Sequence, residues 1–219
     1  MEPIGIDNGI GQGDPLSMIL YQFYNADLLD IPAEKGELAI AYVDDMLLLA
    51  TAVTFQEAHV KLVSMMTRAG GIDEWSWEHN SPLEYSKLAL IDFAHVRSSK
   101  VRPPLILPQQ EVLPTESTKY LGVIFDQNLS WKAQHARVIG KGASWTSQIR
   151  RLTRSTWGIT PKHARRLYIS VAIPRILYAT DVWCAPTDQD TLKTSGSRKV
   201  IRQLTTVQRS GTLAITGGL

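Results

Sequence analysis

The chain has 219 residues, of which 44% are hydrophobic and 20% charged, a balance that is typical of folded globular proteins and excludes a disordered or fibrous one. Cys184 is the only cysteine, which excludes intramolecular disulfides and cysteine-rich zinc sites. Charged residues interrupt every apolar stretch before the roughly 18 residues that a membrane span needs, and Met1-Glu-Pro does not resemble a signal peptide. We therefore expect a soluble, intracellular protein without a membrane partner.

The net charge of +2 conceals two parts of opposite sign. Residues 1–126 contain 8 Lys and Arg against 18 Asp and Glu, whereas residues 127–219 contain 15 against 3. A basic segment with few acids is the expected electrostatic footprint of polyanion binding, because cations that neutralise phosphates release condensed counterions. The alternative is that these cations are ordinary solvated helix faces.

A glycine-rich loop leads into the first expected helix. Asp14 suits the N-cap and Pro15 the first helical position. The helix should carry one apolar face, made of Leu16, Ile19, Leu20, Phe23, Tyr24 and Leu28. Glycines in the preceding loop let backbone amides approach a phosphate or a base, although such a loop is equally found in tight turns.

Two adjacent carboxylates, Asp44 and Asp45, interrupt an apolar run at residues 39–50. Burial of unpaired like charges is costly, so the pair requires a cation or an exposed turn. The pattern predicts a β-hairpin with strands at residues 38–43 and 46–50 and a turn at Asp44-Asp45. Both carboxylates would stand at the hairpin tip, where they could bind Mg²⁺ or serve only as turn residues.

The next elements follow from local signals. Thr54-Phe-Gln-Glu57 predicts a capping box for a helix that Gly70-Gly71 ends. Residues 87–93 are expected to form a short strand, and residues 102–108 a proline-rich loop with an edge strand. Residues 119–126 are expected to form one strand that ends in a turn at Asp126.

After residue 127 the sequence becomes helical and basic. We expect a helix over residues 131–156, a second that Thr160 caps and Pro161 opens, with a kink near Pro174, and a third over about residues 192–208. The charge boundary thus coincides with a change from mixed α/β to all-α structure.

Four segments occur in the order of the motifs of reverse transcriptases from non-LTR (LINE-like) retrotransposons, and the chain resembles this family over nearly its whole length. Gly11–Ser17 resembles motif B, Tyr42-Val-Asp-Asp45 resembles the Tyr/Phe-X-Asp-Asp motif C, and His79-Asn-Ser with Lys87 resembles motif D. Lys119-Tyr-Leu-Gly-Val123 resembles motif E, the primer grip. Segments around Arg166, Ile176–Trp183 and Val207 resemble the helical thumb that follows.

The resemblance implies an α+β fold: a partial right-hand polymerase palm, with an antiparallel sheet and packed helices, over residues 1–126, and an all-α basic thumb or connection over residues 127–219. It implies an RNA-directed DNA polymerase that uses an RNA template, a DNA primer and deoxynucleotides. Two Mg²⁺ ions about 4 Å apart would activate the primer 3′-oxygen and stabilise the leaving pyrophosphate. A complete element of this type would work in the nucleus.

The resemblance also assigns roles to residues. Asp44 and Asp45 would be the catalytic metal ligands, and Lys87 would neutralise or protonate the pyrophosphate. The nucleotide and template would be bound by Gly11, Gln12, Gly13, Pro15, Ser17 and Tyr42. The primer grip would be Tyr120, Leu121 and Gly122. The nucleic-acid backbone would contact Lys132, Arg137, Lys141, Arg150, Arg151 and Arg154.

The family's first catalytic aspartate, in motif A, lies well upstream of motif B, but few residues precede Gly11 here. Asp7 is poorly placed to substitute for it. We therefore expect a retrotransposon fragment that begins inside the palm and has no polymerase activity by itself, because metal positioning dominates phosphoryl-transfer catalysis. The alternatives are a non-catalytic nucleic-acid-binding remnant and a decayed retroelement copy.

Overall fold

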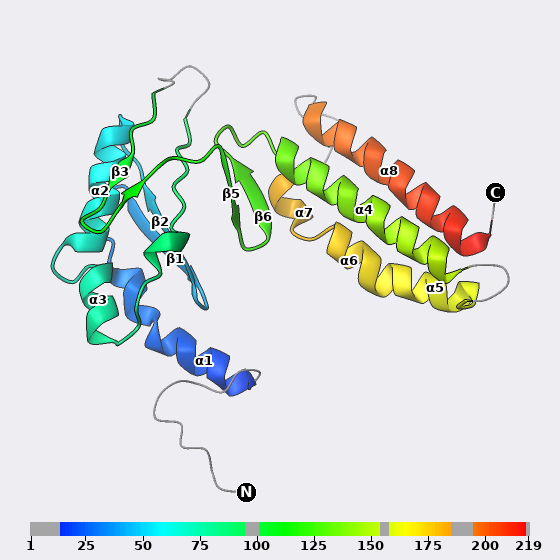
Figure 1. The fold of residues 1–219 in the computed structure, drawn as a ribbon, viewed down its shortest axis with the longest axis horizontal. Coiled ribbons are helices and arrows are strands. Elements are labelled where there is room, and N and C mark those ends of the chain that lie inside the picture. Colours follow the sequence, from blue (N-terminus) through cyan, green and yellow to red (C-terminus); the bar gives the residue numbers. More distant parts are fainter. Residues whose placement is uncertain (1–13, 95–100, 154–157, 185–194, 218–219) are drawn as a thin grey trace, which may run out of the picture. The chain divides into compact units, whose positions relative to one another are not determined.

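The computed structural model describes residues 14–94, 101–153, 158–184 and 195–217 (Figure 1). The chain forms two compact units. Unit 1 comprises residues 1–92 and 97–115, and unit 2 comprises residues 93–96 and 116–219. The main boundary between the units, at residues 115 and 116, therefore lies before the charge boundary at residue 127. As a result, the segment that resembles the primer grip belongs to the same unit as the basic helices.

Unit 1 begins with helix α1 (Pro15–Tyr24) and a short 3₁₀ helix (Ala26–Asp30). The Asp14 carboxylate accepts a hydrogen bond from the Leu16 amide at 3.0 Å, which confirms the predicted start of the helix. The predicted apolar face is largely uncovered within the described residues: Phe23 is 76% exposed, whereas Ser17 is the buried side chain of α1.

The predicted hairpin is present, with strands β1 (Glu37–Tyr42) and β2 (Asp45–Ala50) in antiparallel register. Its turn lies one residue earlier than expected, at Val43-Asp44, because Tyr42 pairs with Asp45. Val43 has a φ of 56°, which is uncommon for a β-branched residue. The Asn25 side chain donates a hydrogen bond to the Val43 carbonyl at 3.2 Å and holds this turn.

Helices α2 (Phe55–Thr67) and α3 (Ile72–Glu78) pack with the hairpin around the core of unit 1. The predicted capping box is formed, since Thr54 accepts from the Glu57 amide and the Glu57 carboxylate accepts from the Thr54 amide. The core side chains are Leu28, Ile31, Met65, Met66, Ile72, Trp75, Leu90, Leu105, Leu107 and Val112.

The expected strand at residues 87–93 is not formed. Tyr85–Lys87 is a 3₁₀ helix, and the segment has one isolated bridge, from Leu90 to Pro114. Pro114 has no N–H group to extend a ladder, so pairing stops there. The proline-rich segment instead supplies strand β3 (Leu105–Ile106), which pairs with β4 (Glu111–Val112).

Unit 2 begins with a second hairpin, β5 (Ser117–Tyr120) and β6 (Val123–Asp126), where one continuous strand was expected. The chain reverses at Leu121-Gly122, whose φ angles are 43° and 81°. Two successive residues with positive φ match the right-handed twist of a two-residue hairpin. The predicted turn after Asp126 is present as well, closed by a hydrogen bond from the Leu129 amide to the Asp126 carbonyl.

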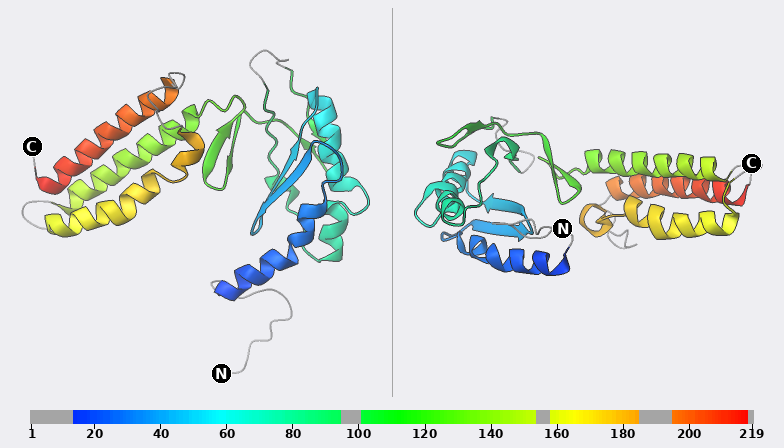
Figure 2. Two further views of the ribbon diagram at one scale, coloured as in Figure 1. Left: turned by 180° about the vertical axis from the view of Figure 1, so that it is seen from behind. Right: turned by 60° about the horizontal axis from the view of Figure 1, so that its bottom comes forward.

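The remainder of unit 2 is helical, as predicted (Figure 2). The elements are α4 (Lys132–Leu152), α5 (Pro161–Leu167), a π-helical segment (Tyr168–Ala172), α6 (Ile173–Ile176), α7 (Thr180–Trp183) and α8 (Ser195–Thr216). Helices α4 and α8 lie side by side in the same direction, and α5 to α6 run back along them (Figures 1 and 2). Consistent with this arrangement, Thr153 at the end of α4 donates to the Ala214 carbonyl near the end of α8.

Two features of these helices depend on single residues. The π-helical segment ends two residues before Pro174, near the predicted kink. Gly142 allows α4 to approach α8 closely, since a Cβ atom there would lie 2.6 Å from a methyl carbon of Val207. None of the described helices combines the length and the apolar character that a membrane span requires.

Candidate functional site

The two carboxylates that the sequence singles out lie at the tip of the β1–β2 hairpin. Asp44 is in the turn, Asp45 begins β2, and both are exposed. Tyr42, which precedes them, is also exposed. Within the described residues, no cluster of three or more acidic, histidine or cysteine side chains could hold a metal ion. The tip therefore presents two adjacent oxygen ligands, suited in type to a hard cation but fewer than a full coordination shell.

Helix α1 reaches the hairpin tip through its C-terminal end. Asn25, the C-cap of α1, is the residue that contacts Val43. Pro15 and Ser17 lie toward the other end of this helix, about 15 Å and about 12 Å from Asn25 at 1.5 Å per residue. Among the hydrogen bonds of the described residues, the one from α1 to this turn is made by Asn25 and not by the two predicted nucleotide-binding residues. Gly11, Gln12 and Gly13 lie outside the described residues.

Lys87 stands in the short 3₁₀ helix after α3 and is exposed. Its ammonium group forms an ion pair with Glu84, whose hydrogen bond raises the pKa of Lys87 above its usual range. An exposed pair at i, i+3 contributes little to stability. The contact found for Lys87 is thus local.

The β5–β6 hairpin, which includes the predicted primer-grip residues, is held at its tip by two side chains. Arg137 of α4 donates to the Gly122 carbonyl at 2.9 Å, and the Tyr178 hydroxyl donates to the Leu121 carbonyl at 3.0 Å. The Tyr178 ring also packs on Gly122, where an added Cβ would lie 3.1 Å from a ring carbon. This turn is therefore fixed from two sides.

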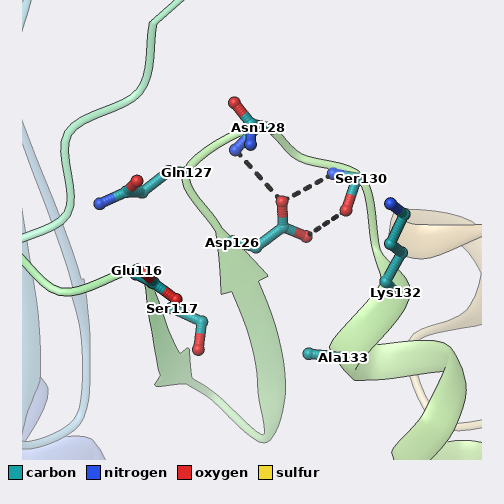
Figure 3. A pocket seen from close by; sticks show the side chains of 8 residues that line it. All are labelled: Glu116, Ser117, Asp126, Gln127, Asn128, Ser130, Lys132 and Ala133. Atoms are coloured by element: carbon teal, nitrogen blue, oxygen red, sulfur yellow. Dashed lines mark hydrogen bonds between the residues drawn. The ribbon is translucent and has the colours of Figure 1, made fainter. Parts of the chain in front are cut away.

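The hairpin is joined to α4 by Asp126, which lies beside an open hollow (Figure 3). Its carboxylate accepts hydrogen bonds from the amides of Asn128, Ser130 and Trp131 at 3.1, 2.9 and 2.8 Å, and from the Ser130 hydroxyl at 3.2 Å. Burial raises the pKa of Asp126, but these hydrogen bonds outweigh it and the pKa falls below its ordinary value. Because its own loop uses both oxygens, Asp126 has a structural role.

The predicted backbone-binding cations do not share one face. Lys132 and Arg150 are each nine positions from Lys141 on α4, which is about half a turn around the helix at about 100° per residue. Arg137 and Lys141, at i and i+4, do lie on one face. Arg151 is exposed near the C-terminal end of α4, and Arg154 lies outside the described residues.

Two curated proteins show significant sequence similarity to the chain. It is 25% identical over 189 residues to the RNA-directed DNA polymerase from mobile element jockey of Drosophila funebris, an alignment that covers 81% of this chain and 19% of that protein. It is 34% identical over 68 residues to the retrovirus-related Pol polyprotein from type-1 retrotransposable element R1 4 of Nasonia vitripennis, covering 31% and 17% respectively. The chain is related to the reverse transcriptases of non-LTR retrotransposons.

The similarity to the jockey polymerase extends over most of the chain, so this relationship does not depend on the Asp-Asp pair alone. The chain spans about a fifth of the length of each of these two non-LTR relatives. No protein-family model matches the chain. No solved structure matches it either.

Two cations that sequence reasoning missed lie near Lys141. Lys119 of β5 and Arg175 of α6 both act electrostatically on its ammonium group, together with Arg137. Lys119 is the first residue of the segment that resembles motif E, and this position in the sequence could have identified it as a candidate. Arg175 follows a proline in a helix whose direction the sequence does not reveal.

Proposed function

We propose that this chain forms part of the polymerase region of an RNA-directed DNA polymerase, with unit 1 contributing to the palm and unit 2 serving as a thumb or connection that holds the primer–template duplex. The observation that carries the proposal is the exposed Asp44-Asp45 pair at the tip of a hairpin, within a segment whose order of motifs is that of non-LTR reverse transcriptases. The similarity to the jockey polymerase supports it.

In this proposal Asp44 and Asp45 would hold Mg²⁺, because magnesium prefers hard oxygen ligands. The bound ions would supply activation of the primer 3′-oxygen and charge stabilisation of the leaving pyrophosphate. The hairpin contributes by keeping both carboxylates in water, with Asp45 on the paired strand β2 and Asp44 in the adjoining turn. Lys87 would act by charge near the leaving group, and its ion pair with Glu84 would have to open for that role.

The metal site is tested with Mn²⁺, which broadens the NMR signals of nearby nuclei. Titration of the ¹⁵N-labelled chain should broaden the amides of residues 43–46 first, and Asp44→Asn/Asp45→Asn should abolish this selectivity. Asp27→Asn/Asp30→Asn, which neutralises two exposed acids elsewhere in unit 1, should leave it unchanged. Equal broadening in the Asp44→Asn/Asp45→Asn variant and the unmodified chain would contradict the metal site.

A second candidate function is nucleic-acid binding without chemistry, which the charge of residues 127–219 favours, with 15 Lys and Arg against 3 Asp and Glu. A primer-extension assay with Mg²⁺ separates the two functions. Incorporation that Asp44→Asn eliminates supports the polymerase and overturns the expectation that the fragment is inactive by itself. Salt-sensitive duplex binding with neither incorporation nor selective Mn²⁺ broadening at residues 43–46 supports the binding function, and the absence of binding argues against both.

A further inference from the structure

The turn that carries Asp44 has a strained backbone. Val43 has a φ of 56°, whereas Asp44 is not among the described residues with a positive φ. A positive φ at the first of two turn residues alone is the pattern of a type II′ turn, in which glycine normally takes that position. A β-branched residue there is a genuine outlier, and such strain persists only where the surrounding structure imposes it. Another contact must therefore select this conformation.

The Asn25 side chain makes that contact. Its Nδ2 atom donates to the Val43 carbonyl at 3.2 Å, and the residue is only 7% exposed. This carbonyl belongs to the peptide group that joins Val43 to Asp44. Type II′ and type I′ turns differ in the orientation of this peptide group, because flipping it reverses the sign of φ at the second turn residue. The hydrogen bond thus fixes the direction in which Asp44 leaves the turn relative to Asp45.

Asn25 is itself anchored at the junction of α1 and the 3₁₀ helix. Its backbone amide donates to the Tyr21 carbonyl at 3.0 Å, and its backbone carbonyl accepts from the Leu28 amide at 3.1 Å. Leu28 is buried in the core of unit 1, and the 3₁₀ helix packs against β1. The position of the donor is therefore set by helices and core, and does not depend on the turn that it binds.

The rest of the carboxamide does not explain its burial. The Oδ1 atom of Asn25 is buried and has no hydrogen-bond partner among the described residues. A buried, unpaired acceptor destabilises a fold, so an apolar side chain would serve packing better at this position. What asparagine adds is one donor directed at the turn. The cost of burying it is thus explained by the conformation that it imposes on Val43 and Asp44.

We propose that Asn25 is a positioning residue for the metal site: its side-chain amide selects the type II′ form of the turn and thereby sets the relative orientation of the two carboxylates. This inference rests on the proposed role of Asp44 and Asp45 as Mg²⁺ ligands. Without the amide, Val43 would return to a negative φ or the peptide group would flip. The apparent metal affinity would then fall in proportion to the population of the competent turn.

The first test removes the donor with Asn25→Leu, which keeps the branched shape of the side chain. A strong intraresidue nuclear Overhauser effect between amide and Hα protons reports a positive φ, and it should be strong at Val43 and weak at Asp44 in the unmodified chain. In Asn25→Leu it should weaken at Val43 or strengthen at Asp44. The Mn²⁺ concentration that half-broadens the amides of residues 43–46 should rise about two- to tenfold, which corresponds to the loss of one net hydrogen bond.

Ser76→Ala is the matched control. It removes a side-chain hydrogen bond to the Ser81 carbonyl elsewhere in unit 1, and it should change neither the Overhauser effects nor the Mn²⁺ midpoint.

Val43→Gly supplies a readout that a purely structural role of Asn25 would not move. Glycine adopts a positive φ without strain, and the pair Gly-Asp favours the type II′ turn by itself. In this background Asn25 should no longer be needed, so Asn25→Leu/Val43→Gly should bind Mn²⁺ within about twofold of Val43→Gly alone. A loss as large as that in the Val43 background would show that Asn25 does not act through the turn, and would overturn the inference.

The outcomes separate this inference from the proposed function. Absence of selective broadening in the unmodified chain contradicts the metal site, and the inference fails with it. An unchanged Mn²⁺ midpoint in Asn25→Leu leaves the metal site standing and overturns the role of Asn25. If Asn25→Leu does not fold, the unmodified chain decides: Mg²⁺ should shift the side-chain amide signals of Asn25 together with the backbone amides of residues 43–46, and unshifted side-chain signals would overturn the inference.

Discussion

Replacement of Asp126 by alanine should destabilise unit 2 more than any comparable loss of an acidic side chain there. Its carboxylate accepts the four hydrogen bonds that connect the end of β6 to the start of α4. Trp131 at the N-cap position makes no side-chain cap, so Asp126 provides this function from five residues away. A hydrogen bond to a charged group contributes about 1.5–3 kcal/mol, and loss of a helix cap costs about 0.5–2 kcal/mol.

Because the four hydrogen bonds share one carboxylate and water replaces part of them, their contributions do not add fully. We expect Asp126→Ala to lower the free energy of unfolding by about 2–3 kcal/mol, and Asp126→Asn, which keeps an acceptor, by about 1 kcal/mol. With a urea dependence of about 2 kcal/mol per molar, the alanine variant's midpoint should fall by about 1–1.5 M. The circular dichroism signal, to which the helices of unit 2 contribute most, measures the urea midpoint.

Asp181→Ala is the matched control, since it removes an exposed acid from the same unit and should change stability by less than about 0.5 kcal/mol. The pH dependence adds a second criterion. The folded-state pKa of Asp126 is depressed, so its contribution is complete above the unfolded pKa of about 3.9 and is lost as pH falls through the folded value. Equal midpoints for Asp126→Ala and Asp181→Ala at neutral pH would refute the reasoning.

Glycine substitutions test the close approaches in unit 2 by the same urea assay. Gly122→Ala should lower the free energy of unfolding by about 1–2 kcal/mol, because φ is 81° and the new methyl group would lie 3.1 Å from the Tyr178 ring. An unchanged urea midpoint would contradict the conformation described for this turn. Gly142→Ala should destabilise by about 1 kcal/mol or more through overlap with Val207, and Val207→Ala should relieve part of the loss in the double variant. Gly140→Ala, which meets no atom within 4 Å, should instead stabilise by about 0.5–1 kcal/mol, and a loss there would indicate that helix propensity does not govern the site.

Elements with strong local rules were predictable from the sequence. The starts of α1 and α2 follow from Asp14 and Thr54, whose side chains satisfy backbone amides within the same turn. The Asp-Asp hairpin also follows from local pattern, and the turn differs by one residue because strand register, fixed by the Tyr42–Asp45 pair, decides where the chain reverses. Such register depends on packing against the rest of the unit.

The remaining features depend on contacts between residues distant in sequence. Leucine is a poor residue for a positive φ, so Leu121-Gly122 is not an evident turn until Arg137 and Tyr178 are seen to hold its carbonyls. The group of cations around Lys141 was only partly predictable for the same reason. Spacing along α4 relates Arg137 to Lys141, but no local rule brings Arg175 of α6 to the same place.

The π-helical segment Tyr168–Ala172 sets the rotational phase of the chain that follows it. Each residue of an α-helix advances about 100° around the axis, so removal of one residue from this segment would turn α6 by about that angle. Ile176, now buried, would rotate out of the core, and the guanidinium of Arg175 would leave its place over the Trp145 ring. The number of residues in this segment, more than their identity, therefore determines which side chains of α6 face the core.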